Sequence, residues 1–152
     1  MKRNWLNNLF ALTLILTLIS CSSTGQTIKQ SVVAPRTIRS PASIPPGLVP
    51  YAPSFVASLE SKGFIVGSTT DPRALELRFE HNDSVMNLSV SASLWRQGVP
   101  VLSASSTNSG WGTAIARGGA LNSLAQKTLR EFDSQLTELS PRLQIVPDEN
   151  EK

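Results

Sequence analysis

Residues 85–95, VMNLSVSASLW, decide the fold of this chain. Apolar residues at every second position alternate with Asn and Ser, and this period of two is typical of a β-strand with one face on a core and the other in water. The sequence RQG follows at 96–98, where Gly98 can adopt the positive φ of a tight turn. We therefore predict a long hairpin that returns over residues 99–106.

Two further apolar patterns precede the hairpin. The sequence ALELRFEH at 74–81 alternates in the same way and predicts a strand with one wet face, and the short apolar run at 64–67 predicts another strand. Residues 54–62 have apolar side chains at helical spacing and are followed by Gly63, which stops a helix. A helix therefore leads into the sheet.

The last element is the clearest helix in the sequence. Apolar residues lie three or four apart from Leu121 to Leu139, with charged residues on the opposite side, and Pro141 ends the pattern. The elements together predict an α+β domain over residues 53–142, an antiparallel sheet of about four strands with two helices packed on one face. Residues 143–152 are predicted to be a polar C-terminal tail.

The first 20 residues have the composition of a secretory signal. Lys2 and Arg3 supply a positive start, and LFALTLILTLI at 9–19 is an apolar run. A transmembrane helix needs about 20 such residues, so this run is too short to span a bilayer but fits the apolar region of a signal.

The signal ends in Leu18-Ile19-Ser20-Cys21, which resembles the lipobox of bacterial lipoproteins. The resemblance implies that signal peptidase recognises Leu18, Ile19 and Ser20 and cuts before Cys21, which is then acylated on its thiol and its new amino group. Several acyl chains hold a protein stably on a membrane. Ser22 follows in place of Asp, and by resemblance to lipoproteins of enteric-type bacteria this implies the inner leaflet of the outer membrane, facing the periplasm. The alternative is an ordinary core cysteine.

Residues 21–52 are rich in Ser, Thr and Pro and lack a long apolar period. This composition is typical of a linker, so we predict that the lipidated Cys21 is followed by a disordered, flexible tether. Within it, TIKQSVV at 27–33 has the β-branched residues of an edge strand, and it is either part of the tether or an added strand of the sheet.

The charge of the chain argues against a nucleic-acid partner. The formal net charge of +3 includes Lys2 and Arg3 of the signal, so the mature chain carries about +1. The remaining basic residues are scattered singly, whereas binding to a phosphate backbone needs a basic stripe. The single cysteine rules out an intrachain disulfide, so stability must come from packing.

The helix-to-strand sequence FVASLESKGFIV at 55–66, the alternating strands, and the helix at 120–136 resemble a group of small bacterial envelope lipoproteins. The group includes YajG and, more distantly, PelC-type and LpoB-type proteins. The resemblance spans roughly residues 53–140 and consists of pattern without signature residues. It implies a shared fold, an envelope location and an accessory or assembly role, with no common catalytic motif.

The sequence offers few residues for catalysis or metal binding. His81 is the single histidine, beside Glu80 and Asp83, and a histidine next to a turn is more often solvated than part of a site with three or four metal ligands. There is no Gly-x-Ser-x-Gly elbow and no complete phosphate-binding glycine motif. We therefore expect no catalytic residues, no metal and no cofactor.

Trp95 and Trp111 are the candidates for contact with a partner or ligand. Each falls in or beside a predicted loop, and exposed Trp is common at interfaces. In the alternative, both rings fold back over the sheet edge. The serine-rich outer face of the hairpin is either solvated or a surface that a partner can approach closely.

These patterns predict a non-enzymatic accessory or assembly lipoprotein, held on the membrane by acyl chains, that binds an envelope protein partner or associates with itself as a homo-oligomer. The alternative is a lipoprotein that binds a small ligand or a cell-wall glycan through the loop around Trp111.

Overall fold

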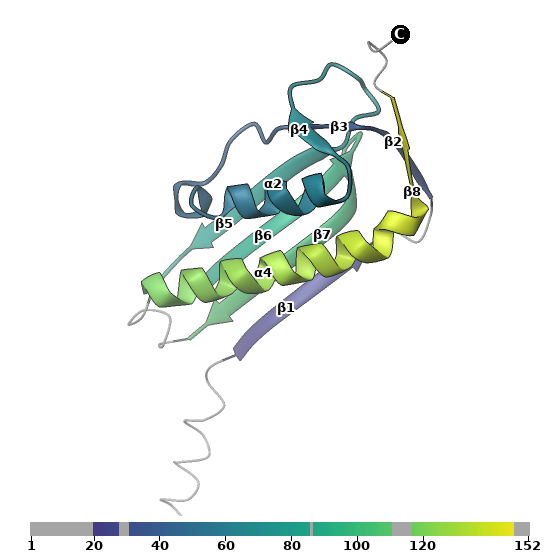
Figure 1. Ribbon diagram of the computed structural model, residues 1–152. Coiled ribbons are helices and arrows are strands. Elements are labelled where there is room, and N and C mark those ends of the chain that lie inside the picture. The colour runs from purple at the N-terminus through teal and green to yellow at the C-terminus, as the bar shows by residue number, and fades with distance from the viewer. Residues whose placement is uncertain (1–19, 28–30, 86, 111–116, 148–152) are drawn as a thin grey trace, which may run out of the picture.

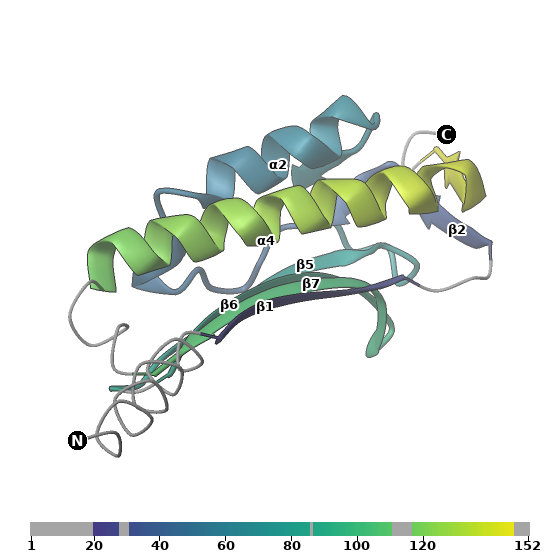
Figure 2. The same ribbon diagram turned by 90° about the horizontal axis from the view of Figure 1, so that it is seen from below.

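The computed structural model describes residues 20–27, 31–85, 87–110 and 117–147. It has two layers, a mixed β-sheet and a pair of helices on one face of that sheet (Figures 1 and 2). The strand order is β1-β7-β6-β5-β3-β4, and β2 and β8 form a second, two-stranded sheet. In chain order, the elements are β1 (Ser20–Thr27), β2 (Val32–Pro35), β3 (Thr37–Arg39), η1 (Pro46–Leu48), α2 (Ala52–Ser61), β4 (Ile65–Gly67), β5 (Glu76–Asp83), β6 (Asn87–Arg96), β7 (Val99–Ser109), α4 (Arg117–Leu139), η2 (Ser140–Arg142) and β8 (Leu143–Val146).

The predicted hairpin forms the centre of the sheet. β6 and β7 pair antiparallel and are joined by a tight turn, in which Gln97 and Gly98 both have positive φ, at 49° and 81°. Such a two-residue turn matches the twist of the strands that it joins. The inward residues of β6 are at most 2% exposed, as the period of two predicted; they are Leu88, Val90, Ala92 and Leu94.

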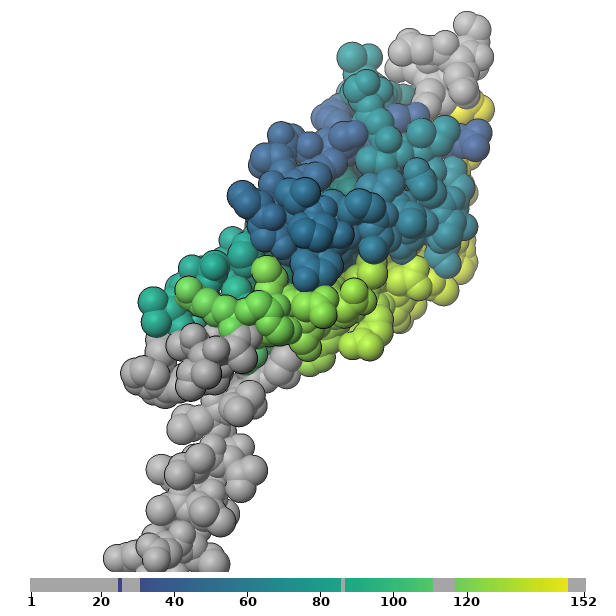
Figure 3. Space-filling model, turned by 60° about the vertical axis from the view of Figure 1, so that its left-hand side comes forward, coloured from purple at the N-terminus to yellow at the C-terminus, as the bar shows by residue number. Residues whose placement is uncertain are grey.

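Both predicted helices cover the same face of the sheet (Figure 2). α4 packs along β6 and β7, and α2 lies beside it (Figure 3). The ring of Phe55 in α2 meets Phe132 of α4 and Phe79 of β5 edge-on, at centroid distances of 5.4 and 5.3 Å. Ser58 Oγ donates to Asp133 Oδ1 at 2.7 Å, so a hydrogen bond also joins the two helices.

Part of the segment predicted to be a tether belongs to the domain. β3 pairs parallel with β4 and with the first residue of β5, which makes the sheet mixed and larger than the four antiparallel strands expected. The prediction of a disordered tether is therefore wrong for residues 32–48, and also for residues 21–27, which belong to β1. The physical reason for residues 32–48 is burial, because four apolar residues of this stretch are at most 2% exposed; they are Val32, Ala34, Ile38 and Leu48.

The C-terminal residues also differ from the predicted polar tail. β8 pairs parallel with β2, and the backbone N–H of Arg36 donates to the carbonyl of Val146 at 3.0 Å. Residues 143–146 are therefore a strand. Because β2 and β8 come from opposite ends of the domain sequence, neither has a local partner that a sequence pattern would indicate.

The two edge strands of the large sheet are β4 and β1. β1 pairs antiparallel with β7 along its whole length. Thr27 ends β1 and Val32 begins β2, so the stretch 27–33 contributes to two different sheets. In the described part of the chain, no helix has the length and apolar character needed to cross a membrane.

Candidate functional site

The face of the sheet opposite α2 and α4 is the candidate site. No described helix lies over it (Figure 2). We call this surface the outer face, and its residues alternate along each strand with residues buried under the helices. They are Glu76, Arg78 and Glu80 of β5, Ser89, Ser91, Ser93 and Trp95 of β6, and Ser103 and Ser105 of β7.

Trp95 is held in a fixed position on the outer face. Its Nε1 donates to Ser93 Oγ at 2.8 Å, and the guanidinium carbon of Arg78 lies 4.7 Å from the centre of the indole. Arg78 is itself held by both carboxylate oxygens of Glu76, each at 2.9 Å. A cation–π contact and a bidentate ion pair thus orient a partly exposed indole on the sheet face, and not over a sheet edge.

These contacts keep both charged groups charged. The hydrogen bond from Arg78 lowers the pKa of Glu76, against the opposing effect of burial, and the hydrogen bond to Glu76 raises the pKa of Arg78. A general acid or base works best when its pKa lies near the working pH. The pair is therefore suited to orienting Trp95 and to binding charged groups, and poorly suited to exchanging protons near neutral pH.

Serine side chains occupy the middle of the outer face. Ser93 is opposite Ser103, and Ser91 is opposite Ser105, across the β6–β7 pair. On the other side of β6, Ser91 is opposite Glu80. Small hydroxyl side chains leave the surface nearly flat and offer hydrogen-bond donors and acceptors, so a partner can approach the strands closely.

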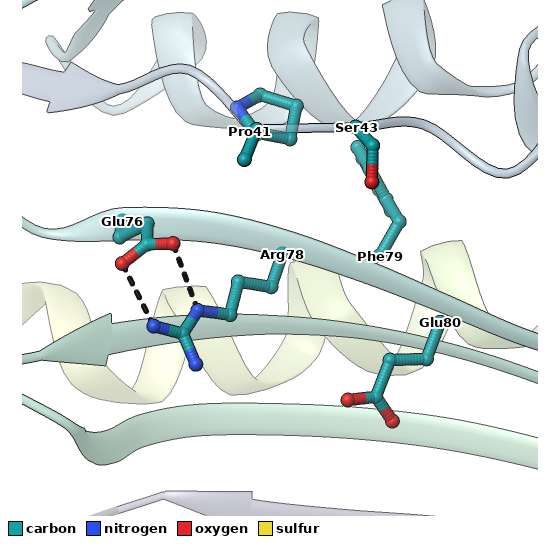
Figure 4. Close-up of a pocket in the computed structure, with 7 residues that line it drawn as sticks. Pro41, Ser43, Glu76, Arg78, Phe79 and Glu80 are labelled. Atoms are coloured by element: carbon teal, nitrogen blue, oxygen red, sulfur yellow. Dashed lines mark hydrogen bonds and ion pairs between the residues drawn. The ribbon is translucent and has the colours of Figure 1, made fainter.

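A shallow pocket borders the outer face at β5 (Figure 4). It arises because β3 pairs with β5 only at Arg39 and Glu76, after which residues 41–43 run past the strand at a distance. Its volume is about 180 Å³. Small-molecule sites usually have about 300 to 1,000 Å³, so this pocket is smaller than most ligand sites. It is lined by Pro41, Ala42, Ser43, Glu76, Arg78, Phe79 and Glu80.

His81 lies away from the outer face. It is opposite Val90 in an inward register, and a Cβ added to Gly47 would come within 3.0 Å of its ring. His81 is half-buried, so the interpretation of it as a solvated residue holds only in part: Nε2 is buried and has no hydrogen-bond partner among the described residues. No group of three or more metal-binding side chains occurs in this described part of the chain.

The other predicted site residues fall partly outside the described residues. Ser20 and Cys21 begin β1, and Cys21 is opposite Asn108 of β7. Leu18, Ile19 and Trp111 lie outside the described residues. Of the two candidate tryptophans, the structure therefore places Trp95 alone.

Sequence reasoning missed Arg78 as the partner of Trp95. The alternation of β5 correctly predicts that Glu76 and Arg78 share the solvent-exposed face, and this was the sequence signal that could have pointed to Arg78. The pairing could not be derived, because it depends on which residues of β5 and β6 lie opposite one another, and the sequence pattern does not set that register.

No protein-family model and no curated protein sequence matches the chain. Among solved structures, it is similar to two PelC dodecamers from Paraburkholderia phytofirmans, one of them a variant. The variant is 14% identical over 75% of this chain and 98% of its own, with a TM-score of 0.40. The other is 17% identical over 76% and 99%, with a TM-score of 0.34. A minor lipoprotein from Acinetobacter baumannii is 13% identical over 65% and 93%, with a TM-score of 0.34. Similarity at this distance assigns neither a family nor a function.

Proposed function

We propose that the protein is a lipid-anchored envelope lipoprotein without enzyme activity, an accessory or assembly factor that uses its outer face to bind an envelope protein or a second copy of itself. The lipobox pattern at 18–21 supplies the anchor, with Cys21 as the acylated residue. Ser22 after the cysteine favours the periplasmic side of the outer membrane.

The observation that carries the proposal is the oriented Trp95 on an open sheet face. Trp and Arg are the residue types that contribute most binding energy at protein interfaces, above all when their side chains are already ordered. Here Ser93 and Arg78 fix the indole before any partner arrives. A partner therefore gains apolar contact without the entropy cost of ordering the side chain.

The neighbouring serines fit the same role. Ser91, Ser103 and Ser105 are partly exposed on the same face as Trp95, and they provide a flat rim that can exchange hydrogen bonds with a partner. Glu80 is exposed at the border of this rim and adds a charge that can select among partners.

A photocrosslinking amino acid placed on each face tests the proposal. We would replace Ser91 on the outer face, and Glu138 on the exposed side of α4 as the matched control, in the full-length protein in cells. We expect one defined adduct from position 91, lost when Trp95→Ala is added, and none from position 138. The mass of the adduct distinguishes self-association from a different protein.

The proposal is contradicted if position 91 gives no adduct, or if the same adducts arise from both positions. A Trp95→Ala variant that keeps the adduct in full would show that binding at this face does not use the indole.

A further inference from the structure

We infer that the end of the sheet that carries Cys21 sits in the interfacial layer of the membrane, with Val85 entering the lipid. The inference rests on the proposed acylation of Cys21. It adds the orientation of the domain and names a second contact with the bilayer.

The strand register places the anchor and a β-turn at the same end of the sheet. Cys21 is opposite Asn108 of β7, and Asn108 is opposite Leu88 of β6. Cys21 is therefore level with the second residue of β6. The turn between β5 and β6 lies beyond that level, at the lower left of Figure 1.

The spacing of strands and residues gives the distances. Neighbouring strands are about 4.8 Å apart, so the β5–β6 turn lies about 10 to 15 Å to the side of Cys21. Each residue of a strand spans about 3.3 Å, so the turn extends roughly 3 to 7 Å beyond the level of Cys21 along the strand axis. The acyl chains begin at Cys21, and the headgroup layer of one leaflet is only about 5 to 7 Å thick. With the strands running toward the membrane, the turn enters that layer.

The surface of the turn suits this position. Val85 is 67% exposed, which makes it the most exposed of the large apolar residues in the described part of the chain. A single exposed valine is common on soluble proteins, and its place beside the anchor is what gives it meaning. Burial of its side chain in the interfacial layer adds an apolar contact to that of the acyl chains.

Hydrogen bonds and an ion pair hold the described residues that flank Val85. Ser84 and Asn87 exchange backbone hydrogen bonds at 2.9 and 3.3 Å. Arg117 at the start of α4 forms an ion pair with Asp83 at 3.0 Å and donates to the carbonyl of Ser84 at 2.9 Å. Because Asp83 and Arg117 neutralise each other, neither introduces an unpaired charge at the lipid surface.

The opposite end of the hairpin supplies a matched control. Val99 follows the β6–β7 turn, is 60% exposed, and lies about one strand length from Val85. Since Cys21 is the single cysteine and its thiol would be acylated, Val85→Cys or Val99→Cys would carry the only free thiol in the lipidated protein. Each variant can therefore be labelled at one known position with an environment-sensitive dye.

The experiment uses the full lipidated protein in vesicles of phosphatidylethanolamine and phosphatidylglycerol. We expect the dye at position 85 to show a blue-shifted, several-fold stronger emission and to be quenched by lipids with a nitroxide near the headgroup. The dye at position 99 should stay in water and be quenched by dissolved iodide. Equal emission and equal iodide quenching at the two positions would overturn the inference.

Two measurements separate failure of the inference from failure of the proposed anchor. The mass of the N-terminal peptide reports acylation of Cys21, and flotation with the vesicles reports anchoring. An acylated, floating protein whose position 85 stays in water overturns the orientation alone. A protein without acyl chains overturns the anchor and the orientation together.

Discussion

Two strands from the first 39 residues are held in opposite ways: β1 is an edge of the large sheet, whereas β3 lies between β5 and β4. β1 is eight residues long, and its sequence SCSSTGQT has no aliphatic or aromatic side chain. β3 has only three residues, yet Ile38 at its centre is fully buried. A strand is therefore fixed more by what it buries than by how long it is.

Polar contacts reinforce the difference. Arg39 of β3 donates to the backbone carbonyls of Thr69 and Asp71, at 3.4 and 3.3 Å, and so joins this strand to the loop before β5. At the β1 edge, Gly25 lies so close to Glu131 and Gln135 of α4 that a Cβ would force their side-chain ends to move. The edge strand β1 thus relies on close backbone approach, whereas β3 relies on burial and charge.

The largest expected effect is the loss of the buried side chain in β3. Ile38→Ala leaves a cavity in the core and should lower the free energy of unfolding by about 2 to 5 kcal/mol. Urea denaturation of residues 21–152 carrying Cys21→Ser measures it. Ile65→Ala is the matched control, because Ile65 lies on the adjacent strand β4 and is 47% exposed, and it should cost much less. Equal losses of free energy of unfolding in the two variants would show that burial of Ile38 is not what holds β3 in place.

We expect an intermediate loss of stability from protonation of Asp71, which lies in the loop that Arg39 contacts. Hydrogen bonds from the side chain of Arg73, at 2.7 and 3.0 Å, lower the pKa of Asp71 from its usual 3.8 to about 2, although burial opposes this shift. Since the folded pKa is depressed, the stabilisation is complete above the unfolded pKa and is lost as the pH falls through the folded value. The chain should therefore lose stability between about pH 4 and about pH 2.

Asp71→Asn tests this assignment. The variant lacks the titrating carboxylate, so its deficit in urea midpoint relative to the parent should be large near neutral pH and should shrink as the pH approaches about 2. Glu138→Gln on the exposed side of α4 serves as the control for general charge effects. A deficit for Asp71→Asn that stays constant across this pH range would show that the pairing does not depend on the ionised carboxylate.

The smallest effect is expected at the β1 edge. A chain that begins at residue 31 lacks β1 but keeps β2 and β3, and its free energy of unfolding should lie within about 1 kcal/mol of the chain that begins at residue 21. The reason is that the net gain from each backbone hydrogen bond is close to the entropy cost of ordering one residue. Urea denaturation of both chains measures the difference. A loss as large as that of Ile38→Ala would place β1 among the stabilising strands of the core.

Local sequence patterns predicted the elements whose partners are near in the chain. The alternation in β5 and β6 gave the hairpin and its buried face, and apolar spacing gave both helices. β2, β3 and β8 were missed because each has three or four residues and pairs in parallel with a distant segment. Such pairs carry no turn signal between them.

The candidate site was predictable in part for the same reason. The wet face of β5 and the serines of the hairpin follow from a period of two, and Trp95 was singled out from its place beside the turn. Its contact with Arg78 depends on the register between β5 and β6, in which Trp95 is opposite Glu76 and Ser93 is opposite Arg78, and no local pattern indicates that register. The inward position of His81 follows from the same alternation as Phe79, although its buried Nε2 does not.

The pairing of β1 with β7 and of β2 with β8 has a consequence for the order in which the domain can fold. A chain that emerges with its N-terminus first exposes 20–39 long before the last strand is available. β5, β6 and β7 follow one another directly and can pair early, because contacts between near segments form fastest. Cys21 must therefore wait unpaired until β7 has emerged, and under the proposed acylation the modifying enzyme would meet it in an accessible segment.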